Sequence, residues 1–109
     1  MPMLSVRHYV TDDGRDPFME WIKKLRDPIT KGQVLKRVNR IEGGNFGDHK
    51  SCRDGVWELR IDQGPGYRVY YAMADRVVVL LLTGGDKGSQ DADIERAIGY
   101  WKHWQRSSA

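Results

Sequence analysis

The sequence predicts a small α+β domain in which a mainly antiparallel sheet carries an N-terminal αα-hairpin and a C-terminal helix, in the order β-α-α-β-β-β-α. Three observations lead to this prediction. Apolar residues recur at helical spacing in two segments between residues 16 and 43, polar and apolar residues alternate between residues 50 and 83, and helical spacing returns after residue 89. With 109 residues, 39% of them hydrophobic and 30% charged, the chain can bury a core, and we expect one domain over residues 1–109.

The N-terminal part is expected to contain one strand and two helices. Residues 4–10 have the pattern of a short strand. Each helix then begins with an Asp-Pro pair, at residues 16–17 and 27–28, because aspartate caps a helix and proline suits its first position. The two apolar stripes consist of Phe18, Trp21, Ile22 and Leu25, and of Val34, Leu35, Val38 and Ile41. The basic residues off the second stripe are expected on a solvated face, and they are Lys31, Lys36, Arg37 and Arg40.

The C-terminal part is expected to contain a hairpin, a further strand and the last helix. Asp54-Gly55 is a turn signal, and residues 63–65 form a short loop between two alternating runs. The segment Val77–Leu82 is apolar on both faces, which predicts a central strand covered from each side. Ser89 is the expected N-cap of the last helix. The apolar stripe of this helix consists of Ile94, Ala97, Ile98, Trp101 and Trp104.

The hairpin places two arginines side by side. With a three-residue loop, Arg60 lies opposite Arg68 on the face that we expect to be exposed. Glu58 lies opposite Tyr70 on the same face. Like charges at opposite positions of a ladder are destabilising, so the arginine pair needs an explanation.

Two explanations of this pair remain open from the pattern alone. One is a bound anion, because guanidinium groups bind phosphate oxygens in a bidentate way and Tyr70 beside them can stack on an RNA base. Truncating Arg68 should then leave stability unchanged or raise it, because a like-charge pair is relieved. The other explanation is that the arginines pair with Glu58 or Asp62.

Two lysines extend the candidate site. The register decides the position of Lys50, because a two-residue turn places it opposite Leu59, whereas an extra loop residue or a bulge places it opposite Arg60. Lys87 lies in the glycine-rich stretch TGGDKGSQ before a helix start, where backbone N–H groups can approach a phosphate. The formal net charge of +3 permits a nucleic-acid partner.

The sequence has no pattern typical of a metal or cofactor site, and we expect no cofactor. His8, His49 and His103 are widely separated, and no P-loop, nucleophile elbow or dinucleotide fingerprint occurs. Cys52 is the only cysteine and is expected to be a buried, inert thiol. No apolar stretch is long enough to cross a bilayer, so we expect a soluble cytoplasmic protein.

Five stretches follow one another over nearly the whole chain, namely F-x-x-W-I-x-x-L, GNFGDHK, GVWELRI, GPGYRVYY and LLLTGGDKGSQDADI. In this order they resemble the RelE/ParE superfamily of toxins from toxin–antitoxin systems. The resemblance is closest to the HigB-like branch, the phage-derived addiction module killer proteins. It implies a RelE-like, microbial-ribonuclease-like fold and an endoribonuclease that cleaves messenger RNA, usually on the ribosome. It also implies a cognate antitoxin, often of the helix-turn-helix type.

The resemblance further implies roles for individual residues. The basic positions that match those of RelE-type ribonucleases or of the HigB-like branch, and that are expected to be catalytic, are Lys50, Arg60, Arg68 and Lys87. The residues expected to contribute to RNA binding are His49, Glu58 and Tyr70. RelE-type enzymes often carry a functional tyrosine near the start of the last helix, where this sequence has Ala92 and Asp93.

Metal-free RNA cleavage begins when a 2′-hydroxyl attacks the adjacent phosphorus, and it needs a base, positive charge for the phosphorane and an acid. Arginine stays protonated, so Arg60 and Arg68 supply only charge and hydrogen bonds. Lys50 is the expected base because like charges nearby favour the neutral form of a lysine, with Glu58 and His49 as alternatives. Two other functions remain open, a ParE-like toxin that poisons DNA gyrase and a noncatalytic RNA-binding phage accessory protein.

Overall fold

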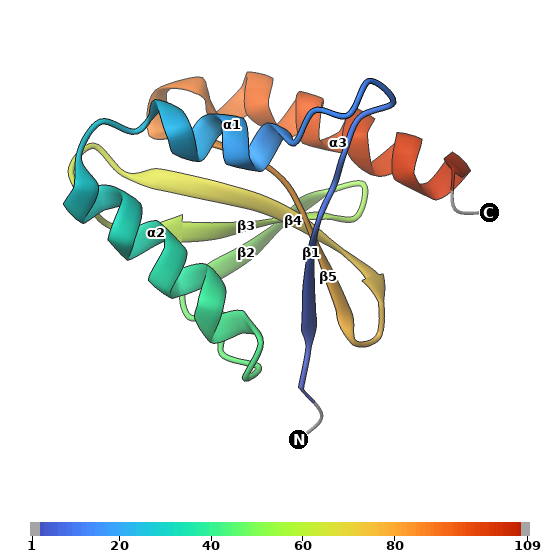
Figure 1. The fold of residues 1–109 in the computed structure, drawn as a ribbon, viewed down its shortest axis with the longest axis horizontal. Helices are drawn as coiled ribbons and strands as arrows, with labels where there is room; N and C mark the ends of the chain where they lie inside the picture. The colour runs from blue at the N-terminus through green and yellow to red at the C-terminus, as the bar shows by residue number, and fades with distance from the viewer. Residues whose placement is uncertain (1–2, 108–109) are drawn as a thin grey trace.

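Helices cover both faces of a five-stranded sheet in the computed structural model, which describes residues 3–107 (Figure 1). In chain order the elements are β1 (Ser5–His8), α1 (Pro17–Lys24), α2 (Pro28–Ile41), β2 (His49–Arg53), β3 (Val56–Ile61), β4 (Tyr67–Asp75), β5 (Val78–Asp86), the 3-10 turn η1 (Lys87–Ser89) and α3 (Gln90–Ser107). The predicted α+β class, the αα-hairpin and the C-terminal helix are confirmed. No helix within the described range is both long enough and apolar enough to span a membrane.

The sheet is mixed and has one strand more than predicted. Its order is β1-β5-β4-β3-β2, with β1 parallel to β5 and the other neighbouring pairs antiparallel. The strand missing from the predicted order is β2, the segment before the Asp54-Gly55 turn whose register the sequence left open, so the observed order of elements is β-α-α-β-β-β-β-α. Most residues of β2 are exposed, and the apolar alternation that identifies a half-buried strand is therefore missing from it.

The strand predicted to be central lies next to the central strand of the sheet. The segment Val77–Leu82 falls largely within β5, whose interior residues are buried from both sides, as predicted. However, β4 occupies the middle of the sheet, and β5 lies between β4 and β1. The continuous apolar run indicates burial from both sides but does not indicate that the N-terminal strand pairs beyond β5.

Both helices of the αα-hairpin begin where the Asp-Pro pairs predict. The side chain of Asp16 accepts a hydrogen bond from the N–H of Met19 at 3.1 Å, and that of Asp27 accepts one from the N–H of Ile29 at 3.0 Å. Each cap satisfies a backbone donor that the helix itself leaves free. These local signals position the hairpin against the sheet.

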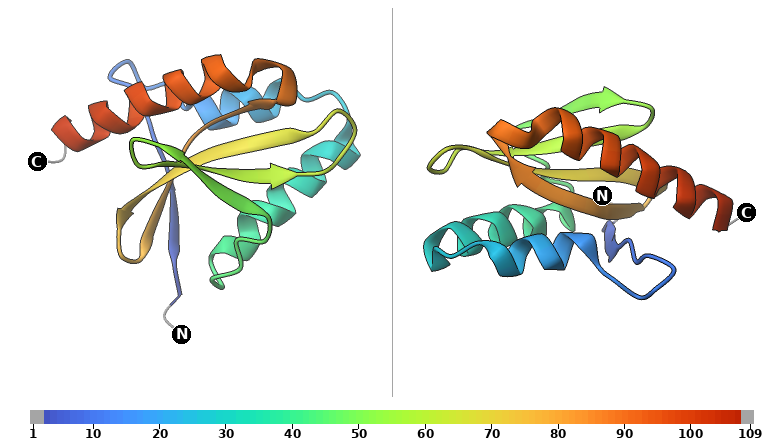
Figure 2. Two further views of the ribbon diagram at one scale, coloured as in Figure 1. Left: turned by 180° about the vertical axis from the view of Figure 1, so that it is seen from behind. Right: turned by 90° about the horizontal axis from the view of Figure 1, so that it is seen from above.

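Two apolar cores lie on the two faces of the sheet. Figure 2 shows α1 and α2 on one face and α3 on the other. The helical residues of the first core, on the side of α1 and α2, are Phe18, Ile22, Val34, Val38 and Ile41. Those of the second core, on the side of α3, are Ile94, Ala97 and Ile98. Helix α3 covers part of the hairpin face that the sequence predicted to be exposed, and Glu58 and Tyr70 on this face are only 3% and 0% exposed. A strand pattern distinguishes two faces but does not indicate which of them a distant helix will cover.

Two adjacent glycines let both helix layers approach the end of β5 closely. A Cβ atom on Gly84 would overlap the ring of Trp21 in α1, and one on Gly85 would overlap the carboxylate of Asp93 in α3. The backbone of β5 is therefore in direct contact with side chains from both sides. This contact fixes the position from which η1 and Lys87 start.

Candidate functional site

A pocket of about 390 Å³ lies at the end of the β3–β4 hairpin, and we call it the hairpin pocket. Its polar lining consists of Asp48, Arg60, Asp62, Arg68 and Lys87. Three of the residues predicted to be catalytic, Arg60, Arg68 and Lys87, thus lie around one pocket although they come from three segments of the chain.

The local structure explains how these three side chains meet. Arg60 on β3 lies opposite Arg68 on β4, which confirms the predicted register. In the connecting loop, Gly64 and Gly66 have φ angles of +55° and +90°, which glycine adopts without steric cost. The N–H of Lys87 donates a hydrogen bond to the carbonyl of Gly66 at 3.1 Å, so the start of η1 is held against the hairpin loop.

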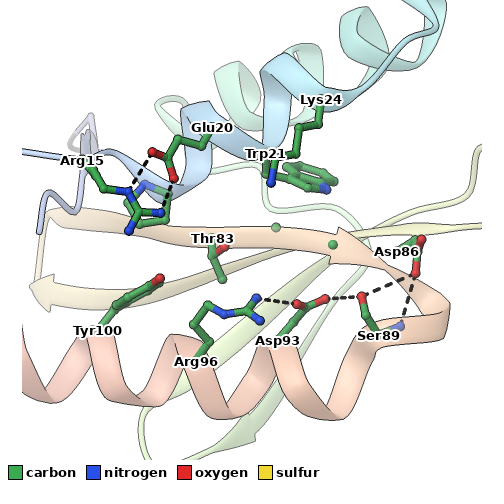
Figure 3. A pocket seen from close by; sticks show the side chains of 13 residues that line it. Arg15, Glu20, Trp21, Lys24, Thr83, Asp86, Ser89, Asp93, Arg96 and Tyr100 are labelled. Atoms are coloured by element: carbon green, nitrogen blue, oxygen red, sulfur yellow. Dashed lines mark hydrogen bonds and ion pairs between the residues drawn. The ribbon is translucent and has the colours of Figure 1, made fainter.

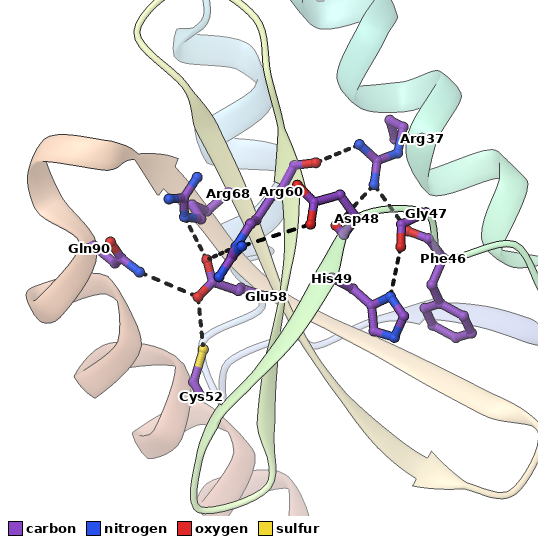
Figure 4. Close-up of polar contacts among 10 residues, drawn as sticks. All are labelled: Arg37, Phe46, Gly47, Asp48, His49, Cys52, Glu58, Arg60, Arg68 and Gln90. Carbon is purple, nitrogen blue, oxygen red and sulfur yellow. Dashed lines mark hydrogen bonds and ion pairs between the residues drawn. The ribbon is translucent and has the colours of Figure 1, made fainter.

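The carboxylate of Glu58 lies between the two arginines (Figure 4). Its Oε2 atom is 2.6 Å from Nε of Arg68 and 3.6 Å from Nε of Arg60. Its Oε1 atom accepts from Nε2 of Gln90 at 3.4 Å and from the thiol of Cys52 at 3.7 Å. The carboxylate offsets the repulsion between the arginines, so the predicted pairing with Glu58 is confirmed.

This ion-pair cluster retains the capacity to bind an anion. Glu58 approaches both arginines most closely at Nε, the nitrogen next to the aliphatic chain. The terminal nitrogens Nη1 and Nη2, which form the fork that recognises phosphate, are therefore farther from Glu58 than Nε is. The contacts of Glu58 with the two Nε atoms are ion pairs of poor hydrogen-bond alignment, because none of these three buried atoms makes an aligned hydrogen bond with a described residue.

Tyr70 does not form the predicted stacking surface. Its ring is fully buried beneath α3, and its hydroxyl has no hydrogen-bond partner among residues 3–107. Burial raises the pKa of Tyr70 well above its usual value, so it stays neutral. Burial also raises the pKa of the half-buried Cys52 thiol to about 11, which agrees with the predicted inert cysteine.

Lys50 takes neither of the positions that the sequence predicted. It lies opposite Glu58 on the exposed strand β2, not opposite Leu59 or Arg60, and it is not part of the lining of the hairpin pocket. The reason is an irregularity between residues 51 and 53, where β2 has one residue more than its partner strand. A bulge on this strand shifts the register in the direction opposite to the one considered from the sequence.

His49 lies away from the hairpin pocket. It is opposite Leu59, and its ring centroid is 5.5 Å from that of Phe46 and 5.8 Å from that of Trp57. These rings line a separate, largely apolar pocket of about 320 Å³ that also includes Tyr71. The structure therefore separates His49 from Arg60 and Arg68.

Three residues of the site were not predicted from the sequence. Asp48 lines the hairpin pocket 3.9 Å from Nη1 of Arg60, and Gln90 at the start of α3 contacts Glu58. Arg37 was expected on a solvated face, but its guanidinium donates to main-chain carbonyl groups next to the pocket. Asp48 lies in the motif GNFGDHK. Arg37 lies three residues after Val34 and four before Ile41, so helical spacing places it at the border of the apolar stripe of α2, whereas Lys36 and Arg40 lie on the exposed side.

A second pocket, of about 360 Å³, lies between α1 and α3 (Figure 3). Its two arginines are already engaged by carboxylates. Arg15 donates to both carboxylate oxygens of Glu20 at 2.9 and 2.7 Å, and Nη1 of Arg96 donates to Asp93 at 2.9 Å. Because terminal guanidinium nitrogens are used in these bonds, this pocket is less suited to bind a phosphate than the hairpin pocket.

Comparison with known proteins assigns the chain to a family. Residues 20–98 match the family profile described as Phage derived protein Gp49-like (DUF891). The chain belongs to this Gp49-like family. An uncharacterized protein of Haemophilus influenzae (strain ATCC 51907 / DSM 11121 / KW20 / Rd) is 50% identical over 80 residues, which cover 73% of this chain and 81% of that protein. The Gp49-like family is associated with toxin–antitoxin systems.

The segment that matches the Gp49-like family contains the whole polar lining of the hairpin pocket, from Asp48 to Lys87. It also contains Glu58, which contacts both arginines, and Gln90, which contacts Glu58. Among the described residues, no group of three or more histidine, cysteine, aspartate or glutamate side chains is arranged to hold a metal ion.

Proposed function

We propose that this Gp49-like protein is the toxin of a type II toxin–antitoxin system, related to the HigB-like branch of the RelE/ParE superfamily, and that it is an endoribonuclease acting on messenger RNA at the ribosome. The observation that carries the proposal is the convergence of Arg60, Arg68 and Lys87 on the hairpin pocket. Three cations around one pocket suit the phosphate of an RNA chain, and family membership supports the assignment to a toxin.

The proposed reaction, without a metal ion, is attack of a 2′-hydroxyl on the adjacent phosphorus, which forms the P–O2′ bond and breaks the P–O5′ bond. A base takes the proton of the 2′-hydroxyl, the leaving 5′-oxygen takes up a proton, and the products are a 2′,3′-cyclic phosphate and a 5′-hydroxyl. Arg60 and Arg68 stabilise the charge of the phosphorane, and Lys87 from η1 adds a third cation at the same end of the hairpin. Glu58 is buried between the arginines, so its role is to orient them. Asp48 is our candidate for the base, because it lines the pocket beside Arg60, whereas Lys50 lies on β2 outside this lining.

The proposed partners are messenger RNA, the ribosome and a cognate antitoxin, with the cytoplasm as the site of action. A pocket lined by clustered cations is best neutralised by an acidic segment or by blocked access to the ribosome. We therefore expect a small antitoxin, of the helix-turn-helix type, encoded beside this gene.

Brief induction of the protein is expected to cut cellular transcripts inside their reading frames. Primer extension on transcripts isolated shortly after induction maps these cuts, and the Arg60→Ala variant serves as the control because it lacks one proposed phosphate ligand. Growth should be restored by co-expression of the neighbouring reading frame. Intact transcripts together with broken chromosomal DNA would contradict the proposal and favour a ParE-like gyrase poison. Intact transcripts and intact DNA would favour a noncatalytic RNA-binding protein.

Cleavage is also expected to continue when divalent metal ions are removed. The proposed charge stabilisation comes from the side chains of Arg60, Arg68 and Lys87, which EDTA does not affect. The measurement is cleavage of a short RNA on stalled, crosslinked ribosomal complexes that remain intact without magnesium, with and without EDTA. Activity that disappears with EDTA and returns only with Mn²⁺ or Zn²⁺ would show that the proposed chemistry is wrong.

A further inference from the structure

The side chain of Arg37 joins three main-chain carbonyl groups beside the hairpin pocket. Its Nη1 atom donates to the carbonyl of Arg60 at 2.5 Å. Its Nη2 atom donates to the carbonyls of Phe46 and Asp48 at 3.0 and 3.2 Å (Figure 4). One planar guanidinium from α2 therefore connects the end of β3 with the loop that precedes β2.

Two of these carbonyl groups belong to residues that line the pocket, Arg60 and Asp48. The same two residues are joined directly, because the N–H of Arg60 donates to the carbonyl of Asp48 at 2.8 Å. One guanidinium thus binds the backbone of both Arg60 and Asp48. Since the direction of a side chain follows from its backbone, Arg37 fixes the backbone positions from which the side chains of Arg60 and Asp48 extend.

The loop is shaped around this guanidinium. Gly47 has a φ angle of +62°, and a Cβ atom added to it would lie 2.8 Å from Nη2 of Arg37. Burial lowers the pKa of Arg37 from its usual value, yet arginine remains charged, so the cation is satisfied by neutral carbonyl groups. A residue that only closed the space between α2 and the sheet would need neither the charge nor the fork of donors.

We propose that Arg37 is a positioning residue of the hairpin pocket, which holds the backbone of Arg60 and Asp48 and makes the geometry of the pocket depend on the docking of α2. The contact between Arg37 and the backbone of Arg60 exists independently of any activity. Its consequence for cleavage rests on the proposed function.

The matched test compares Arg37→Gln with Arg40→Gln. Both changes remove one positive charge from α2, but Arg40 is exposed and donates to none of these carbonyl groups through its side chain. Nitrogen-15 relaxation of the Nε–H groups reports the order of individual arginines. Arg37→Gln is expected to increase the mobility of Arg60 and to leave Arg68, on the next strand, ordered by Glu58. Arg40→Gln should change neither signal.

Cleavage kinetics provide the second measurement. Arg37→Gln should lower kcat by roughly 10- to 100-fold, because a displacement of about 1 Å in a positioned group costs up to 100-fold, while KM for the RNA changes less than about threefold. Arg37→Lys, which keeps the charge but not the fork, should recover only part of the rate. Arg40→Gln should leave kcat unchanged.

The outcomes separate this inference from the proposed function. If the wild-type protein cleaves no RNA, the proposed function fails, and the mobility of Arg60 alone decides the role of Arg37. An ordered Arg60 in folded Arg37→Gln, or an equal fall of kcat in Arg40→Gln, would overturn the inference. If Arg37→Gln does not fold, Arg37→Lys takes its place in both measurements, and full activity with an ordered Arg60 in that variant overturns the inference as well.

Discussion

Replacement of Arg68 by alanine is expected to lower RNA cleavage by roughly 100-fold or more and to lower the free energy of unfolding by about 3–5 kcal/mol. The loss of activity follows from the removal of a proposed phosphate ligand. The loss of stability follows from the 2.6 Å ion pair with Glu58, because Glu58 would remain buried and charged without its nearest partner. From the sequence alone, relief of the arginine pair predicted unchanged or higher stability, and the buried carboxylate reverses that expectation.

A second substitution separates the two losses. Combining Glu58→Gln with Arg68→Ala removes the buried charge, so part of the unfolding free energy should return while cleavage stays low. Urea denaturation and cleavage are measured on the same samples of the wild type, the single variants and the double variant. Recovery of cleavage together with stability would mean that Arg68 acts only through folding, and it would remove this residue from the proposed site.

Replacement of Arg60 by alanine is expected to lower cleavage by roughly 100- to 1000-fold and to change the free energy of unfolding by less than about 0.5 kcal/mol. The side chain of Arg60 is 34% exposed, and its contacts with Glu58 and Asp48, at 3.6 and 3.9 Å, are weak. Arg60→Lys should not restore full activity, because a lysine ammonium cannot form a bidentate fork.

The matched control for Arg60 is Arg76→Ala. Arg76 is an exposed arginine between β4 and β5 that lines the apolar pocket near Tyr71 instead of the hairpin pocket. Its loss should reduce cleavage only slightly and in a salt-dependent way, because it changes only the net charge. Equal losses in Arg60→Ala and Arg76→Ala would indicate a general effect of charge and no specific phosphate site.

Local signals in the sequence predicted the parts of the fold that depend on neighbouring residues. Asp16 and Asp27 cap α1 and α2 as their Asp-Pro pairs indicate, and the short loop sets Arg60 opposite Arg68. The features that were missed depend on distant segments. The parallel pairing of β1, the cover that α3 provides over Tyr70 and the irregularity in β2 leave no periodic signal in their own residues.

The residues of the candidate site also fall into those that local signals predicted and those that depend on distant segments. Arg60, Arg68 and Lys87 could be predicted because they stand in a hairpin and in a glycine-rich loop whose chemistry is visible in the sequence. Lys50 and His49 could not be placed, because their positions depend on the register of an exposed strand. The helical spacing of Arg37 places it at the border of the apolar stripe of α2, but its bonds to β3 and to the loop before β2 depend on segments distant in the sequence.

The parallel pairing of β1 with β5 also gives the fold an order in time. Ser5 lies opposite Val78, so the first strand leaves the ribosome long before its partner is made. Domains fold as units while synthesis proceeds at about 5–20 residues per second. A nascent chain that already carries Arg60 and Arg68 still lacks two residues. Lys87 completes the lining of the hairpin pocket, and Gln90 contacts Glu58. A protein proposed to attack messages during translation thus acquires its pocket only after its own ribosome has passed these last segments.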